Sequence, residues 1–182
     1  MLLAVAAVLM TGCTAVVEGS PSAPSGVLFP PRPREVRLDG VDPCSLLTAE
    51  QWESLGFDGS PTRTNPNVEL FRGHVPTCTV TGFRPKPIAV GVGVVTTVGI
   101  ERWQGNDLAV EVIPITVAGF PAVVATPTRS DMYCSTDVDV ADGQLLDIQV
   151  LDGGGQPAIA QDELCTRATR AAEQLLKALL ER

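Results

Sequence analysis

Four of the five cysteines are the residues whose types and spacing carry the clearest chemistry. Cys44, Cys78, Cys134 and Cys165 are widely separated along the chain. Four such thiols in an exported domain are typical of two disulfides, for which three pairings exist. We favour the sequential pairing, Cys44 with Cys78 and Cys134 with Cys165, which closes two separate loops. A zinc site is the alternative, but zinc ligands usually come in pairs about two to four residues apart, and no two of these cysteines are that close.

The fifth cysteine, Cys13, has a different setting and a different expected chemistry. It follows an uncharged apolar run, residues 1–10, and the small pair Thr11-Gly12. This pattern is typical of a secretory signal, and its last residues resemble the bacterial lipobox, in which the cysteine is lipidated. We expect a signal peptide over residues 1–12 and acyl chains such as palmitate on Cys13. Plain secretion and an uncleaved anchor are the alternatives, although a spanning helix needs roughly 20 apolar residues.

The remaining polar motifs do not predict catalysis. The sole histidine, His74, would need a nucleophile and a carboxylate within reach to form a triad, and the chain has no Gly-x-Ser-x-Gly motif. Gly91 and Gly93 begin like a dinucleotide-binding loop but lie within a predicted strand, where glycines mark close packing or a bulge. We expect no catalytic residues and no cofactor.

Three aspartates, Asp137, Asp139 and Asp142, resemble a calcium loop only in part. The third carboxylate is one residue late and a closing glutamate is missing. We interpret Asp137 and Asp139 as the solvent-facing side of a strand and Asp142 as a turn residue, so we expect no metal. Trp52 and Trp103 are interpreted as core or core-edge residues rather than as platforms for a sugar.

Composition excludes one class of partner and indicates a tether. The net charge of −8 argues against nucleic acid, whose phosphates require clustered Lys and Arg. It also argues against electrostatic docking on anionic lipids, so membrane contact would come from the lipid on Cys13. Residues 13–40 are rich in Pro and Ser and predict an extended tether. The preference for Arg over Lys in an Ala-, Val- and Gly-rich chain is typical of a GC-rich, for example actinobacterial, genome.

A single domain is predicted over residues 41–182. Thr48 and Gln51 form a capping-box pair that begins a short helix, and Gly56 is a signal for its end. Residues 157–181 have apolar side chains at helical spacing, which predicts a long C-terminal helix. A bond from Cys134 to Cys165 would hold that helix on the sheet.

Between the two helices the pattern is that of antiparallel strands. Asp142-Gly143 predicts a type I′ hairpin turn. The fold class is therefore α+β: a short N-terminal helix, an antiparallel sheet of five or six strands, a long C-terminal helix packed on the sheet, and two disulfides. The predicted strands are residues 78–83, 87–97, 111–117, 120–126, 134–141 and 144–151.

The order of these motifs is similar to that of actinobacterial envelope lipoproteins of the LprB and LprC kind, which are classed as a domain of unknown function. The similarity covers roughly residues 42–180, and it implies an exported, lipid-anchored and disulfide-bonded protein without an established activity. The motifs that carry it are Asp42-Pro43-Cys44-Ser45-Leu46-Leu47-Thr48, Cys78, Val117-Ala118-Gly119-Phe120-Pro121-Ala122, Cys134 and Leu164-Cys165.

The function that we expect is a non-enzymatic binding or accessory module at the outer face of the cell membrane. Its partners would be the membrane, through the lipid on Cys13, and an envelope ligand or protein that the sequence does not identify. A hydrolase of the envelope and a structural or assembly factor are the alternatives. An apolar pocket would favour ligand binding, converging carboxylates and His74 in a cleft would favour an enzyme, and a flat apolar patch would favour a protein partner.

Overall fold

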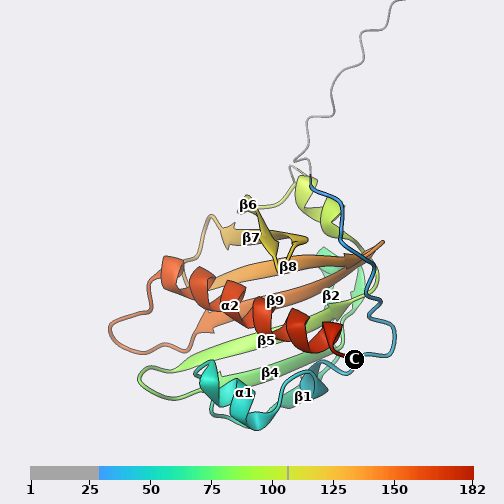
Figure 1. Cartoon of the computed structure of the whole chain (residues 1–182). Coiled ribbons are helices and arrows are strands. Elements are labelled where there is room, and N and C mark those ends of the chain that lie inside the picture. The colour runs from blue at the N-terminus through green and yellow to red at the C-terminus, as the bar shows by residue number, and fades with distance from the viewer. Residues whose placement is uncertain (1–28, 106) are drawn as a thin grey trace, which may run out of the picture.

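The computed structural model describes residues 29–105 and 107–182, and Figure 1 shows their arrangement. Seven antiparallel strands form one sheet in the order β1-β4-β5-β9-β8-β7-β6. A separate ribbon pairs β2 (Asn67–Val68) with β3 (Gly73–His74). The bounds of the sheet strands, in sheet order, are β1 (Thr62–Thr64), β4 (Thr77–Gly82), β5 (Ile88–Val95), β9 (Gln144–Asp152), β8 (Tyr133–Ala141), β7 (Phe120–Pro127) and β6 (Val110–Val117).

The α+β class is confirmed, and the expected count of five or six strands is wrong, because the sheet has seven. The six predicted segments coincide with β4 to β9. The additional strand, β1, has three residues, Thr62–Thr64, and all of them are exposed. A segment this short and polar shows no alternation of apolar and polar residues, so the sequence carries no strand signal there.

Helix α2 (Gln161–Leu180) crosses one face of the sheet (Figure 1). It begins at Gln161 rather than at residue 157, and its apolar side chains recur three or four residues apart. The disulfide between Cys165 on α2 and Cys134 on β8 (S–S 2.10 Å) joins the helix to the sheet. The helix residues buried against the sheet are Leu164, Ala168, Ala171, Ala172, Leu175, Leu176 and Leu179. Each fully buried leucine contributes about 1.5–3 kcal/mol through the hydrophobic effect.

The second disulfide ties the N-terminal end of the domain to the sheet. The 3-10 helix η1 (Pro43–Ser45) is capped by Asp42, whose carboxylate accepts a hydrogen bond from the Cys44 backbone N–H at 3.0 Å. Cys44 is bonded to Cys78 on β4 (S–S 2.05 Å), and both residues are buried. Both disulfides therefore follow the sequential pairing, and each one fixes a helical segment to a strand.

Helix α1 (Ala49–Ser54) follows directly and has a complete capping box. The Thr48 hydroxyl accepts from the Gln51 N–H at 3.3 Å, and the Gln51 side chain accepts from the Thr48 N–H at 2.8 Å. Trp52 is fully buried and packs edge-on against Phe57, with 6.2 Å between ring centroids. This contact completes the core that α2 shares with the sheet.

Residues 29–40, which the sequence assigned to the tether, pack on the domain. The side chain of Leu38 is completely buried, and its N–H donates to the side-chain oxygen of Gln144 at 2.7 Å. The N–H of Val36 donates to the carbonyl of Val140 at 2.7 Å. Because Val36 and Leu38 alternate with charged residues, one side of this extended segment faces the core and the other faces solvent.

On the second face of the sheet, the described residues place loops and 3-10 helices rather than a long helix. This face is covered by residues 65–76, which include the 3-10 helix η2 (Glu69–Phe71), and by the 3-10 helix η3 (Ile100–Gln104). We call these two segments the cover. The cover and this face of the sheet form a second, smaller core of Phe71, Val75, Val95, Val98, Ile100, Trp103, Val123, Ala125 and Leu145.

The two tight hairpins of the sheet differ from each other in turn geometry. In the β8–β9 turn only Gly143 of the pair Asp142-Gly143 has a positive φ, 66°, so the predicted type I′ turn is wrong. A β-bulge between Asp139 and Ala141 accompanies this turn. In the β6–β7 turn both Ala118 (φ 47°) and Gly119 (φ 83°) have the positive φ that a type I′ turn requires.

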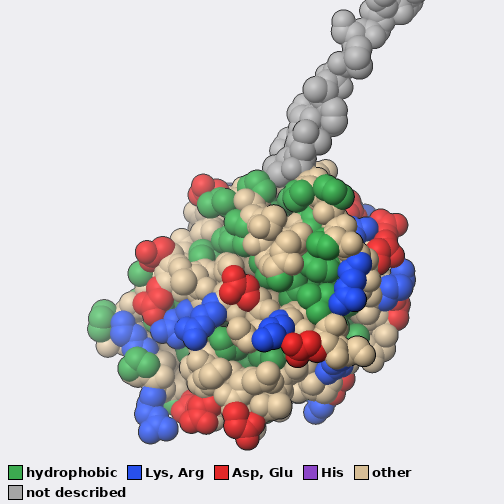
Figure 2. Space-filling view, in the orientation of Figure 1, with side chains coloured by type: hydrophobic (Ala, Val, Ile, Leu, Met, Phe, Trp, Pro, Cys, Tyr) green, Lys and Arg blue, Asp and Glu red, His purple; other side chains and the backbone are tan. Residues whose placement is uncertain are grey.

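Within the described residues, no helix combines the length and the apolar composition that crossing a bilayer requires. On the face that α2 covers, positive and negative side chains are interspersed (Figure 2). That face therefore presents no extended patch of a single charge sign, such as a nucleic-acid-binding surface would need.

Candidate functional site

A cavity of about 210 Å³ lies between the second face of the sheet and the cover. We call it the loop-face cavity. The cover supplies apolar and aromatic walls, and the sheet supplies a polar floor. Its lining residues are Pro66, Val68, Leu70, Phe71, Val75 and Trp103 from the cover, and Thr77, Gly91, Ser135, Asp147 and Gln149 from the sheet. The volume corresponds to roughly seven water molecules at about 30 Å³ each.

The glycines of β5 make room for this cavity. A Cβ placed on Gly91 would meet only the carbonyl oxygen of Gln149, at 4.0 Å, so the space above Gly91 is open. A Cβ on Gly93 would lie 3.0 Å from the Val75 side chain and 3.1 Å from an oxygen of Asp147. The expected close packing is therefore found at Gly93, whereas Gly91 forms part of the cavity floor.

Two aspartates lie side by side on this face. Asp137 on β8 pairs directly across the ladder with Asp147 on β9. Asp137 is completely buried, and neither of its side-chain oxygens has a hydrogen-bond partner when both groups are carboxylates. Asp147 is partly exposed and lines the cavity. None of the ion pairs in the described part of the chain involves either group.

Burial changes the acid–base chemistry of both carboxyl groups. Burial and then the neighbouring charge of Asp147 raise the pKa of Asp137 well above its ordinary value. Burial raises the pKa of Asp147 to about 7, and a hydrogen bond from Asp137 opposes that rise. A protonated Asp137 can donate to Asp147, which satisfies the otherwise unpartnered oxygen. At neutral pH Asp137 therefore keeps its proton, whereas Asp147 gains and loses its proton near this pH.

The residues that line the cavity can bind a cation more readily than they can cleave a bond. Asp147 offers one carboxylate, and the rings of Phe71 and Trp103 lie in the cavity wall. Aromatic faces attract cations, and a carboxylate in a partly desolvated setting does so more strongly. Acid–base hydrolysis would need a second group at the cavity surface, and the buried Asp137 does not reach it.

The interpretation of Asp137 and Asp139 as solvent-facing residues is wrong. Both are buried, with 0 % and 5 % of their surface exposed, because the cover and residues 29–40 lie over this side of β8. Asp139 is paired with Arg32, whose Nη1 lies 2.7 Å from each carboxylate oxygen. Asp142 is exposed in the hairpin turn. No group of three acidic, histidine or cysteine side chains in residues 29–105 and 107–182 is placed to hold a metal ion.

His74 does not line the loop-face cavity. Its side chain is exposed on β3, and its Nδ1 is 3.0 Å from the carbonyl oxygen of Asn65. This contact supports the β2–β3 ribbon. Of the two tryptophans, Trp52 belongs to the larger core, and Trp103 is a wall of the cavity.

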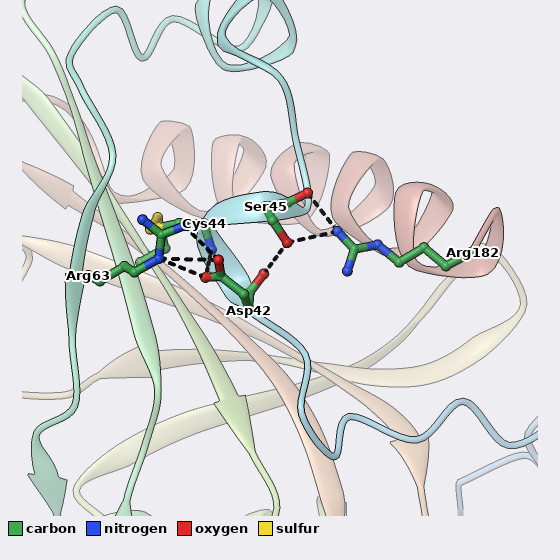
Figure 3. Close-up of polar contacts among 6 residues, drawn as sticks. Asp42, Cys44, Ser45, Arg63 and Arg182 are labelled. Atoms are coloured by element: carbon green, nitrogen blue, oxygen red, sulfur yellow. Dashed lines mark hydrogen bonds and ion pairs between the residues drawn. A yellow bond between two sulfur atoms is a disulfide. The ribbon is translucent and has the colours of Figure 1, made fainter.

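A wider groove of about 440 Å³ opens between residues 38–43 and the ends of β1, β4 and β5. All three of its charged side chains are paired: Asp42 with Arg63, and Asp39 with Arg37 outside the groove. Arg63 on β1 donates to both carboxylate oxygens of Asp42, with a shortest distance of 2.6 Å, and this hydrogen bonding lowers the pKa of Asp42 (Figure 3). Paired exposed charges of this kind leave no free group to recognise a ligand.

The same network reaches the C-terminus of the chain. Arg182 donates to the carbonyl oxygen of Ser45 at 2.6 Å and to its hydroxyl at 3.0 Å, and that hydroxyl donates to the Asp42 carbonyl (Figure 3). These bonds join the start of the domain, the edge strand and the end of α2. We interpret them as structural, and they explain the use of Asp42, Pro43, Cys44 and Ser45 where the domain begins.

The predicted lipidation site, Cys13, and the predicted signal peptide, residues 1–12, lie outside the described residues. Sequence reasoning missed the loop-face cavity. Its available signals were Gly91 and Gly93 in a strand, where glycine indicates close approach or open space, and aspartates that alternate with valines.

Comparison with known proteins gives a family but no activity. No curated protein and no solved structure matches the chain. A family described as protein of unknown function, DUF3558, matches residues 8–178, which include every strand of the sheet, both disulfides and the loop-face cavity. This chain therefore belongs to the DUF3558 family of proteins of unknown function.

Proposed function

We propose that this protein is a lipid-anchored lipoprotein of the cell envelope, of the LprB and LprC kind, whose domain is a non-enzymatic binding or accessory module. The observation that carries the binding function is the loop-face cavity, which has apolar walls and a few convergent polar groups. Binding sites for small molecules commonly have this composition.

Export is supported by the chemistry of the cysteines. Two disulfides join helical segments to the sheet, and stable disulfides are characteristic of oxidising compartments. The fifth thiol, Cys13, follows an apolar run and Thr11-Gly12, as in a lipobox. Two or three acyl chains give stable membrane attachment, where a single chain binds only marginally.

Binding is favoured over the alternative of an envelope hydrolase. The carboxyl pair of Asp137 and Asp147 is the feature that a hydrolase would share, but only Asp147 reaches the cavity. His74 is exposed on β3 and does not join this pair. A structural or assembly role would be favoured by a flat apolar surface, and the large exposed apolar side chains of the described residues, Phe83, Ile113 and Met132, lie in separate loops and strands.

The anchor is tested by Cys13→Ser in the native host, with Thr14→Ala as the matched neighbouring control. The wild type and the control should remain in the membrane fraction and incorporate a labelled palmitate analogue. The Cys13→Ser protein should move to the soluble fraction or the medium, unlabelled and with its disulfides intact. Membrane association of the Cys13→Ser protein would contradict the proposed anchor.

The binding function is tested by native mass spectrometry of protein purified from its own host. We expect a small bound molecule that is absent from the Gly91→Val variant, in which a side chain fills the open space above β5. A bound mass that persists in this variant would place the ligand elsewhere on the protein.

A further inference from the structure

The loop-face cavity contains an imbalance of charge that points to a class of ligand. Among the described residues that line it, Asp147 alone carries a formal charge. The adjacent Asp137 adds a second acidic group behind it, on the neighbouring strand. Buried charges are normally paired with an opposite charge or with a metal ion. Here the described part of the protein supplies neither.

The charged groups on the elements around Asp147 do not provide the missing positive charge. The facing position on β5 is Gly93, and β8 contributes Asp137. The cover has two cations next in sequence to the cavity wall, Arg72 after Phe71 and Arg102 before Trp103, and the Arg72 side chain is exposed to solvent. Arg102 lies on η3. Its guanidinium donates to the carbonyl oxygen of Leu70 at 3.2 Å and pairs with Asp107 at 2.9 Å. Arg102 is therefore already engaged beyond the cavity wall.

The other walls of the cavity suit the organic part of a cation. Phe71 and Trp103 are aromatic, and Val68, Leu70 and Val75 are aliphatic. A hydrated inorganic ion gains little from such walls, whereas an alkyl chain is removed from water on contact with them. The volume of about 210 Å³ is below the roughly 300 Å³ at which pockets for drug-sized molecules begin, so the ligand is small.

We infer that the loop-face cavity binds a small alkylammonium ion, with its charged nitrogen against the Asp147 carboxylate and its alkyl chain against the rings of Phe71 and Trp103. This inference rests on the proposed binding function and names the ligand class of that same site. The ammonium group would supply the positive charge that the two aspartates lack. The partial exposure of Asp147 leaves its carboxyl group within reach of a ligand in the cavity.

The test uses the folded protein and two matched probes, n-butylammonium and the neutral 1-butanol, which has the same chain length. The chain has two tryptophans, so the indole N–H groups give two separate NMR signals. Titration with n-butylammonium at about pH 8 should shift the Trp103 signal and leave the signal of the core residue Trp52 in place. 1-Butanol should cause a much smaller shift at the same concentration.

Two variants and one pH change identify the site. Gly91→Val should abolish the shift by filling the cavity, and Asp147→Asn should remove the preference for the cation, while exposed Asp131→Asn should bind like wild type. Because the pKa of Asp147 is about 7 and alkylamines stay protonated well above that pH, affinity should fall roughly thirtyfold from about pH 8 to 5.5. Asp147→Asn keeps the test valid if Gly91→Val does not fold.

Each outcome decides the inference. A cation-specific shift that is lost in Asp147→Asn supports it. Equal binding of 1-butanol overturns the cation preference but leaves a small-molecule binding module. An absence of binding by either probe overturns the inference, while membrane fractionation of Cys13→Ser and native mass spectrometry still decide the proposed function separately. Binding that survives in Gly91→Val places the probe outside the cavity and also overturns it.

Discussion

The two faces of the sheet are built by different means. The face under α2 is covered mainly by helical elements, α2 together with α1 and η1, and the strands contribute mostly valines, isoleucines and leucines to its core. The opposite face is covered by loops and 3-10 helices, and it contains Ser135, Asp137, Asp139 and Asp147. The close packing of α2 leaves little space for polar groups, whereas the irregular cover encloses several of them together with a cavity. The first face stabilises the protein, and the second provides the candidate site.

The largest expected effect is on the helix face. In the Cys165→Ala variant, α2 loses its covalent link to β8 and the buried Cys134 becomes a free thiol. We expect a loss of about 2–5 kcal/mol in the free energy of unfolding. Chemical denaturation measures this loss, and peptide mapping without reductant should still find Cys44 bonded to Cys78. If stability is unchanged, packing of the apolar side chains alone holds α2 in place.

A smaller effect is expected on the loop face, where the two glycines of β5 serve as a matched pair. Gly93→Ala brings a methyl group to 3.0 Å from the Val75 side chain, so we expect a loss of about 1–3 kcal/mol. Gly91→Ala meets nothing closer than 4.0 Å and should be neutral or stabilise by about 0.4–1 kcal/mol. Thermal unfolding of both variants gives the comparison. Equal losses would mean that the space above Gly91 is closed in solution.

The pH dependence of the free energy of unfolding also distinguishes the two faces, because Asp137 and Asp147 both lie on the loop face. Both aspartates have a folded pKa above the unfolded value of about 3.9, and that of Asp147 is about 7. The folded state therefore binds more protons than the unfolded state between these values, and stability falls as the pH rises from about 4 to 7.

Asp147→Asn should remove the contribution of Asp147 to this pH dependence and leave the contribution of Asp137, whose pKa is raised mainly by burial. The exposed Asp131→Asn should leave the pH dependence unchanged. Melting temperatures at about pH 5 and pH 8 are the measurement. A wild type that is as stable at the higher pH would show that neither aspartate has the raised pKa that its burial implies.

The smallest effect is expected at the exposed network in Figure 3. Arg63→Ala removes an exposed ion pair and should cost about 0–1 kcal/mol. Asp42→Ala removes the same ion pair and also the cap on η1, so its cost should be larger by about 0.5–2 kcal/mol. Denaturant titration of the two variants distinguishes these roles. If Arg63→Ala is the costlier change, Arg63 stabilises the fold through more than its ion pair with Asp42, and the capping role of Asp42 is minor.

The sequence predicts the helix face well because its signals are periodic. The spacing of apolar residues in α2 predicts which side of the helix is buried. The valine-rich strands likewise predict which of their side chains are buried. The four cysteines of the domain allow only three pairings, and the sequential pairing that we favoured is the one found. The β1 strand has no comparable signal, since Thr62–Thr64 is short, polar and exposed.

The loop face could not be predicted in the same way. Alternation in β8 shows that Asp137 and Asp139 share a side, but it does not show what lies over that side. The cover consists of two non-periodic segments separated by β4 and β5, and the sequence does not indicate that they meet. Residues 29–40 did carry a usable signal, because Val36 and Leu38 alternate with charged residues, but their three prolines and the Pro- and Ser-rich residues 20–26 before them indicated a tether.

The packing of residues 29–40 on the domain has a mechanical consequence for the anchored protein that we propose. A force between the membrane and the domain would act first on the Arg32–Asp139 ion pair and on the hydrogen bonds of Val36 and Leu38. If these contacts break, residues 29–43 can detach from the domain and extend. The disulfide between Cys44 and Cys78 prevents the force from detaching the chain beyond Cys44. Release of residues 29–43 would lengthen the tether by roughly 50 Å at about 3.3 Å per residue. The segment would therefore act as a reversible extension that protects the sheet and the loop-face cavity from the load.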